Sequence, residues 1–399
     1  MDNLKSTKTG GAMFGILLAL SLSHLLNDTL QSVISAIYPL IKEGLSLNFS
    51  QIGIITLVYQ ISASVFQPII GLYLDKKPNP WFLPMGMGFT LTGLVILAFA
   101  NSLHLVLISV FLVGIGSATL HPEASRLTSL ASGGKRGLAQ SLFQVGGSMG
   151  VSLGPLLVAL IIAPYGQKNI VFFSILAIIA MIVMLPICRW YKRIIQISGK
   201  RTKSAEVNIK SPLSKNKIIL SLIILLILIF SKYVYMASLT NFYTFYLIDK
   251  FGVSIQTSQF YLFAFLFAAA LGTLLGGPIG DRVGRKYVIW VSILGVAPFT
   301  LLMPHANLLW TCILSICIGL ILSSAFSAIL VYAQELLPMK LGLISGLFFG
   351  LAFGIAGVAS AIMGKIADSH GIEYVYQMCA YMPLLGLITY FLPNIKSKK

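Results

Sequence analysis

The chain has 399 residues, of which 57% are hydrophobic and only 10% charged, and its mean hydropathy is +0.90. Soluble domains carry about 25% charged residues, so a soluble chain of this composition would expose far too much apolar surface. The formal net charge of +17 does not by itself indicate nucleic-acid binding, because in a membrane protein the distribution of basic residues matters more than their sum. The composition therefore predicts an integral membrane protein.

Twelve segments of the chain are long and apolar enough to be spanning helices, each of which needs roughly 20 apolar residues. They lie at about 13–40, 50–74, 82–101, 103–130, 137–163, 168–191, 217–247, 256–280, 286–304, 306–337, 341–366 and 372–393. A polar, basic segment divides them into six and six. We therefore expect an all-α fold with twelve transmembrane helices in two pseudo-symmetric six-helix bundles, at 1–191 and 217–399, joined by a cytoplasmic linker at 192–216.

The positions of Lys and Arg predict the orientation in the membrane. If both termini are cytoplasmic, the cytoplasmic segments carry 22 of these residues and the outer loops carry 4. The N-terminal stretch resembles a signal peptide, since Lys5 and Lys8 precede an apolar run. It has no obvious small-x-small cleavage site, so we expect it to remain as the first helix.

The first span carries a stripe of polar residues on one helix face, because their spacing is i, i+3, i+4 and i+7. These residues are His24, Asn27, Asp28 and Gln31. Ionisable groups inside a membrane cost about 2.5–3.5 kcal/mol each on insertion scales. The stripe therefore predicts a face that lines a polar cavity, and hydrogen bonding between helices is the alternative.

Two loops of similar sequence follow the second and eighth spans: "GLYLDKKPNP" from Gly71 and "GPIGDRVGRK" from Gly277. Their aspartates, Asp75 and Asp281, are 206 residues apart, and a second pair of matching segments, "GLAQSLF" and "GLISGLF", lies 205 residues apart. Two matches at nearly one offset predict duplicated six-helix halves. The second loop also holds Arg282, Gly284, Arg285 and Lys286. We expect these loop residues to act in the conformational change, and an ordinary basic loop is the alternative.

The fourth span ends in "LHPEASRL", which places three ionisable side chains beside a helix-bending proline: His121, Glu123 and Arg126. Glu123 and Arg126 are i, i+3 neighbours and can pair. In one interpretation this cluster sits at the cytoplasmic end, where charges reach water. In the other, Arg126 attracts an anion while Glu123 exchanges a proton.

The fifth span contains Gln144 and then "GGSMGVSLGPLL". Small residues four apart, Gly150 and Gly154, allow close helix packing, and Pro155 is expected to kink the helix. In the seventh span, Lys232 lies about 15 residues from the predicted start, near the middle of a bilayer at 1.5 Å per residue. That depth predicts a cavity-facing role for Lys232, with Tyr235 as a nearby hydrogen-bonding group.

Several of these motifs resemble known sequences. The loop "GPIGDRVGRK" matches the loop signature of the major facilitator superfamily, and Gly150, Gly154 and Pro155 resemble the fifth-helix signature of its exporters. The segments "SHLLNDTLQS", "FQPIIGLYLDKKP", "LHPEASRL" and "GGKRGLAQSLFQVGGSMG" look like those of the fosmidomycin resistance proteins. The chain departs from the exporter patterns at Val110, where an Arg is usual, and at Val158-Ala159, where a Gly pair is usual.

The resemblance implies a bacterial inner-membrane transporter that exports fosmidomycin, a small phosphonate antibiotic, in exchange for protons. His24, Asn27, Asp28, Gln144 and the segment from His121 to Arg126 occupy the family's polar motifs. A phosphonate is anionic, and Arg126 and Lys232 are suited to hold it. Asp28 and Glu123 are then the candidates to carry protons.

Other functions are weighed against this hypothesis. A proton-coupled importer, or an exporter of another small metabolite or organic anion, is the main alternative. The sequence contains no H-E-x-x-H, phosphate-binding loop or nucleophile elbow. We therefore expect no enzymatic activity, no cofactor, no metal and no nucleic-acid partner, and we expect a protein that works as a monomer in the bilayer.

Overall fold

The structure, a computed structural model, describes residues 13–133, 136–198, 214–336 and 341–393, and nearly all of them are helical. The first part of the chain forms α1 (Phe14–Ala36), α2 (Tyr38–Gly44), α3 (Phe49–Lys76), α4 (Phe82–Ala98), α5 (Leu103–Ala131), α6 (Arg136–Leu157), η2 (Val158–Ile162), α7 (Ala163–Tyr165), η3 (Gln167–Phe172) and α8 (Phe173–Ser198). The second part forms α9 (Lys215–Phe251), α10 (Ile255–Val283), α11 (Arg285–Ile293), α12 (Ala297–Leu302), η4 (Met303–His305), α13 (Leu308–Ser323), α14 (Ala325–Leu336), α15 (Leu341–His370), α16 (Ile372–Cys379) and η5 (Met382–Phe391).

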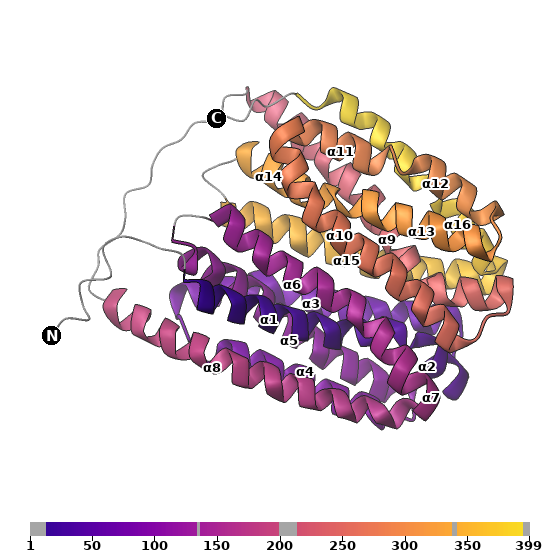
Figure 1. The fold of residues 1–399 in the computed structure, drawn as a ribbon, viewed down its shortest axis with the longest axis horizontal. Helices are drawn as coiled ribbons and strands as arrows, with labels where there is room; N and C mark the ends of the chain where they lie inside the picture. Colours follow the sequence, from indigo (N-terminus) through magenta and orange to yellow (C-terminus); the bar gives the residue numbers. More distant parts are fainter. Residues whose placement is uncertain (1–12, 134–135, 199–213, 337–340, 394–399) are drawn as a thin grey trace.

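The helices form two side-by-side groups. Figure 1 shows α1 to α8, in indigo to magenta, on one side of the molecule and α9 to η5, in rose to yellow, on the other. Within the first group α1 packs on α6 and α4 packs on α5, and within the second α10 packs on α13. The most extensive contacts between the groups are those of α3 with α15 and of α6 with α10. The polar residues of the first group thus lie near the second group. They are on α1, α3, α5 and α6, and α15 is the neighbouring helix of the second group.

Nine helical stretches among the described residues are long and apolar enough to cross a membrane. They run from Phe49–Gly71 to Gly350–His370 and carry nine of the twelve predicted spans. The other three predicted spans lie on α1, on the shorter apolar helix α4, and on α16 with η5. The prediction of an all-α, multi-pass membrane protein is confirmed.

Several helix boundaries differ from the predicted ones. Two predicted spans are divided into shorter helices that begin near prolines, and α9 is longer than expected. The predicted span at 286–304 is divided into α11, α12 and η4, and the span at 372–393 is divided into α16 and η5. Pro298, Pro304 and Pro383 stand at the starts of α12, η4 and η5, where a missing N–H is tolerated. The α9 helix has 37 residues, about 55 Å, and is longer than the predicted 217–247. The start of the predicted linker belongs to α8, and residues 199–213 lie outside the described part of the chain.

A carboxylate on α15 caps the first turn of α3. The Asp368 oxygens accept hydrogen bonds from the Phe49 N–H at 2.7 Å and the Ser50 N–H at 2.8 Å. A Cβ on Gly53 would lie 2.6 Å from the Ser360 carbonyl oxygen, so the two helices also approach closely there. The first turn of a helix leaves N–H groups without partners, and here a residue from the other helix group satisfies them. This contact fixes α15 against α3.

Candidate functional site

The glycines of α6 let α1 approach it closely. A Cβ on Gly146 would lie 2.3 Å from the Ser21 carbonyl oxygen, one on Gly150 would lie 2.2 Å from the Leu25 carbonyl oxygen, and one on Gly154 would lie 2.0 Å from Ser32 Oγ. The predicted small residues therefore lie at the α1–α6 contact. Pro155 lies inside α6, and the π-helical turn η2 follows at Val158. Such a turn is a recognised cause of irregularity in a helix.

Three ionisable side chains meet at this packed region, two from α1 and one from α5. His24 Nε2 lies 3.1 Å from Asp28 Oδ2, and His121 Nε2 lies 3.3 Å from Asp28 Oδ1. The side chains are 2%, 12% and 14% exposed for His24, Asp28 and His121. We call this cluster the trio. One nitrogen or oxygen atom from each side chain lies within 4.8 Å of the other two. Imidazole nitrogens and carboxylate oxygens are also the groups that bind metal ions. The two N···O separations lie near the upper end of the range for hydrogen bonds.

Each histidine of the trio is held by a backbone carbonyl on the other side of its ring. His24 Nδ1 donates to the Phe143 carbonyl oxygen on α6 at 2.8 Å, and the His24 ring stacks on the Phe143 ring at 4.0 Å. His121 Nδ1 donates to the Ser117 carbonyl oxygen at 3.0 Å. A Cβ on Gly147 would lie 2.4 Å from His24 Nε2 and 2.8 Å from Asp28 Oδ2. The α6 backbone therefore forms a wall of the trio.

The other polar residues of the α1 stripe extend the trio into a hydrogen-bond network. Asn27 Nδ2 donates to Asp28 Oδ1 at 3.0 Å. Gln31 Oε1 accepts from the Tyr59 hydroxyl on α3 at 2.6 Å and from Ser117 Oγ on α5 at 3.1 Å. Asn27 Oδ1 and Gln31 Nε2 are buried and have no protein partner among the described residues. The stripe thus faces α3, α5 and α6.

The acid and base of the fourth span pair with each other. Arg126 donates to Glu123 through Nε at 2.9 Å and through Nη2 at 2.7 Å. Nη2 also donates to the Tyr191 hydroxyl on α8, and the guanidinium lies 5.2 Å from the Tyr191 ring centroid. Glu123 is 2% exposed, whereas the Arg126 side chain is 32% exposed. Of the two candidate proton carriers, Glu123 is in a bidentate ion pair and Asp28 is shared between two histidines.

The predicted residues of α9 and α6 lie apart from these bonds. Lys232 is 4% exposed, and its Nζ lies 5.6 Å from the Tyr233 ring centroid. Tyr235 is 1% exposed, and its hydroxyl donates to Met303 Sδ on η4 at 3.9 Å. Gln144 is half-buried on α6, next to Phe143. The structure therefore buries Lys232 and Tyr235 in the second helix group, while the trio lies in the first.

The loop between α10 and α11 is partly described. Gly284 adopts φ +105°, a conformation that favours glycine, and it ends α10 just before α11 begins. Arg282 is exposed, Arg285 is half-buried, and Lys286 Nζ donates to the Tyr390 carbonyl oxygen at 2.9 Å. Gly71 has no heavy atom within 4 Å of an added Cβ. The side chains of Asp75 and Asp281 and the surroundings of Gly277 lie outside the described residues.

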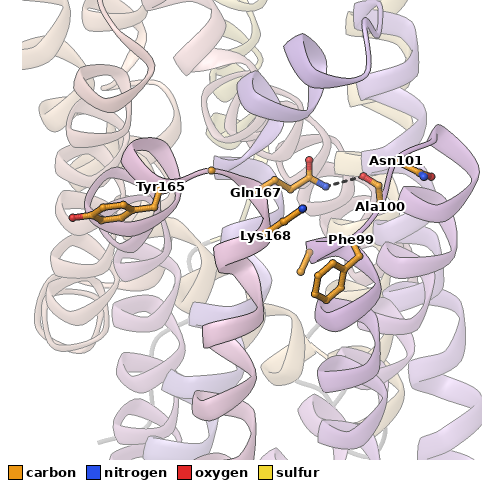
Figure 2. A pocket seen from close by; sticks show the side chains of 8 residues that line it. Phe99, Ala100, Asn101, Tyr165, Gln167 and Lys168 are labelled. Atoms are coloured by element: carbon orange, nitrogen blue, oxygen red, sulfur yellow. Dashed lines mark hydrogen bonds between the residues drawn. The ribbon is translucent and has the colours of Figure 1, made fainter.

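A surface pocket of about 530 Å³ lies on other segments, between the α4–α5 connection and the turn from α7 to η3. Figure 2 shows Gln167 pointing across it toward Ala100, with Lys168 and Phe99 alongside. Gln167 Nε2 donates to the carbonyl oxygens of Leu97 at 2.8 Å and Ala100 at 2.9 Å. These bonds hold two loops together, and no residue of the trio lines this pocket.

Sequence reasoning missed the partners that assemble the site. Tyr59, Ser117, Phe143, Gly147 and Tyr191 come from α3, α5, α6 and α8 and were not predicted. Of these five residues, Gly147 is the one that the sequence could have indicated, because it belongs to the small-residue segment "GGSMG". Phe353 on α15 was missed as well, and its ring lies 6.1 Å from the His121 ring.

The chain is similar to transporters of known family. A family model described as Major Facilitator Superfamily matches residues 20–263 and 225–399. The chain is 58% identical over 393 residues to a protein of Escherichia coli (strain K12) named "Fosmidomycin resistance protein", covering 98% of this chain and 96% of that protein. It is 42% identical over 391 residues to an uncharacterised MFS-type transporter of Bacillus subtilis (strain 168), covering 97% and 95%.

A solved structure has the same fold. It is a bacterial homologue of the human lysosomal transporter Spinster, in an inward-facing and occupied conformation, and it matches with a TM-score of 0.71 over 94% of both chains. The two sequences are 16% identical. At that identity the likeness concerns the fold alone. It agrees with the helical arrangement described above.

Proposed function

The chain belongs to the major facilitator superfamily of membrane transporters, and we propose that it exports fosmidomycin or a similar small anion in exchange for protons. The observation that carries this proposal is the 58% identity, over 98% of the chain, to a relative named for fosmidomycin resistance. The local motifs that resemble that family lie on the helices that form the trio and the Glu123–Arg126 pair. Members of this superfamily are transporters, and we propose no catalytic role for any residue.

Two cationic side chains, one in each helix group, are proposed to hold the anion. Arg126 uses Nε and Nη2 in its bonds to Glu123 and Tyr191, and Nη1 takes no part in these three bonds. The guanidinium can therefore bind a phosphonate oxygen while Glu123 fixes its orientation. Lys232 would add a compact positive charge from α9. Gln31 would donate to the anion through Nε2, and Asn27 Oδ1 would accept from a donor group of the cargo; neither atom has a protein partner among the described residues.

The setting of this transport is also part of the proposal. We propose that the protein lies in a bacterial inner membrane, with both termini in the cytoplasm, since Lys and Arg concentrate in the segments that this orientation makes cytoplasmic. We propose that residues 1–191 and 217–399 act as two six-helix halves joined by the segment 192–216. Alternating access would then consist of movement of one half against the other, with the site between them, and a monomer would suffice.

Drug resistance and vesicle transport test the proposal together. The gene is expressed in a fosmidomycin-sensitive bacterium that lacks its own exporter, and inverted membrane vesicles from the same cells are energised by respiration. We expect a raised inhibitory concentration for fosmidomycin, and uptake of labelled drug into the vesicles that a protonophore abolishes. If neither effect is seen although the protein is shown to be in the membrane, fosmidomycin is not the cargo, and another organic anion is favoured. Uptake that survives the protonophore would contradict proton exchange.

A further inference from the structure

The trio has a hydrogen-bonding arrangement that requires added protons. A backbone carbonyl oxygen only accepts, and the Ser117 hydroxyl, 3.2 Å from His121 Nδ1, uses its one hydrogen in the bond to Gln31 Oε1. The Nδ1 atoms of His24 and His121 therefore both carry hydrogen to bond the Phe143 and Ser117 carbonyl oxygens. In a neutral imidazole the other nitrogen is then a bare acceptor. Both Nε2 atoms nevertheless lie 3.1 and 3.3 Å from oxygens of one carboxylate, which is also an acceptor. A hydrogen bond in either contact requires one further proton.

We propose that His24, Asp28 and His121 together form the site that binds the exchanged protons, one at each contact between an Nε2 atom and the Asp28 carboxylate. This inference rests on the proposed proton exchange and names where it takes place. With both contacts filled, the trio carries one positive charge. With both empty, it carries one negative charge buried beneath α6. The charge of the trio thus changes by two units as both protons leave.

The described side chains around the trio include no second acid that would share this role. On α1 the neighbour is the neutral amide of Asn27, and on α3 the Tyr59 hydroxyl is bonded to Gln31. On α6 the facing groups are the Gly147 backbone and the Phe143 ring, and on α15 the facing group is Phe353. On α5 the charged residues that follow His121 are Glu123 and Arg126, which neutralise each other. Among the described residues around the trio, Asp28 is therefore the acid without an arginine or lysine partner.

The two histidines have different parts in the site. His24 is 2% exposed and is fixed by the Phe143 ring and carbonyl, so it stays with α1 and α6. His121 is 14% exposed and belongs to α5, so its contact with Asp28 joins α5 to α1, as does the bond from Ser117 Oγ to Gln31 Oε1. Loss of the His121 Nε2 proton replaces an attractive contact by two facing acceptors. Because the His121 ring also contacts Phe353, this change reaches α15 in the other helix group.

Purified protein in proteoliposomes tests the assignment with two assays on the same variants. One assay measures exchange of labelled fosmidomycin without a proton gradient, and the other measures its accumulation driven by a pH gradient. Asp28→Asn and His121→Gln should keep exchange within a few-fold but lose the gradient-driven part by about tenfold, a typical coupling effect. His104→Gln, an exposed histidine on the same helix as His121, should keep both. Gradient-driven accumulation that persists in both trio variants would overturn the assignment.

A substrate-free measurement separates this inference from the proposed cargo. Histidine-selective ¹⁵N NMR of the wild-type protein reports the protonation of each ring nitrogen, and the His24→Gln and His121→Gln variants assign the signals. We expect hydrogen on both Nδ1 atoms at every pH at which the protein is folded, with Nε2 signals that change with pH and shift in Asp28→Asn. If fosmidomycin is not transported but this pattern is present, the cargo is wrong and the proton site stands. Stoichiometric zinc in the purified protein, lost in His121→Gln, would assign the trio to a metal instead and overturn the inference.

Discussion

Helices α1 and α9 differ sharply in the chemistry that they bury, although the predicted duplication would make them equivalent. Helix α1 buries His24 and Asp28, and the Asp28 carboxylate oxygens lie 3.1 Å from His24 Nε2 and 3.3 Å from His121 Nε2. Helix α9 buries tyrosines that make neutral bonds: the Tyr243 hydroxyl donates to Ser315 Oγ at 3.1 Å, and Tyr246 stacks on Tyr376 at 4.2 Å. A repeated helix can therefore keep its place in the packing while its polar groups diverge. In our proposal proton binding belongs to the first helix group, and the second contributes Lys232 and an aromatic core.

The largest expected effect comes from adding one methyl group to the wall of the trio. In Gly147→Ala the new Cβ would lie 2.3 to 2.8 Å from side-chain atoms of His24 and Asp28, so these side chains, or the helices that carry them, must shift. Overpacking of this kind costs about 1–3 kcal/mol, and here the strain acts on the trio itself. We expect fosmidomycin resistance to fall to the level of cells without the transporter. Gly88→Ala on α4, where an added Cβ meets nothing within 4 Å, is the control and should keep resistance.

The next effect concerns Lys232, the α9 side chain that is proposed to hold the anion. Lys232→Gln removes the charge, and we expect the KM for fosmidomycin to rise by about 10- to 100-fold, the equivalent of a charge-assisted hydrogen bond of about 1.5–3 kcal/mol. Initial rates in inverted vesicles at several drug concentrations measure it. Lys168→Gln, in the surface pocket of Figure 2, should leave KM unchanged. An unchanged KM in Lys232→Gln would mean that the second helix group does not bind the anion through this side chain.

A smaller effect distinguishes the two buried carboxyl groups of the first helix group. Glu123→Gln keeps a group that can accept from Arg126 but removes the charge of the bidentate pair. We expect the apparent affinity for the drug to fall about fivefold, or about 1 kcal/mol, with the ratio of gradient-driven to exchange transport unchanged. A collapse of that ratio in Glu123→Gln, as large as in Asp28→Asn, would show that the proton role is not confined to the trio.

The smallest effect on transport is expected in the tyrosine core of α9. Tyr243→Phe removes the hydroxyl that bonds Ser315, and its cost should be about 1 kcal/mol in the free energy of unfolding. Thermal unfolding of the purified protein measures the cost, and proteoliposome transport at a temperature well below the transition should be unchanged. Loss of proton coupling in Tyr243→Phe would remove the distinction between α1 and α9.

The sequence predicts the architecture well because each span is encoded locally, by a run of apolar residues and by flanking Lys and Arg. It also predicts the α1 stripe, since His24 and Asp28 are one helical turn apart. It does not predict that His121 completes the trio, because that contact depends on how α5 packs on α1. For the same reason the partners Phe143 and Tyr59 were not predicted. The pairing of Glu123 with Arg126 was foreseen from their spacing, but the contact with Tyr191 was not.

The most direct measurement of the central claim is substrate-induced proton release from the purified protein in weakly buffered solution, followed with a pH-sensitive dye. Fosmidomycin is added to the wild type, to Asp28→Asn and to His104→Gln at equal protein concentration. We predict that the wild type and His104→Gln release protons on binding and that Asp28→Asn, shown by labelled-drug binding to take up fosmidomycin, releases none. Equal proton release from all three would contradict the claim that the His24–Asp28–His121 trio holds the exchanged protons.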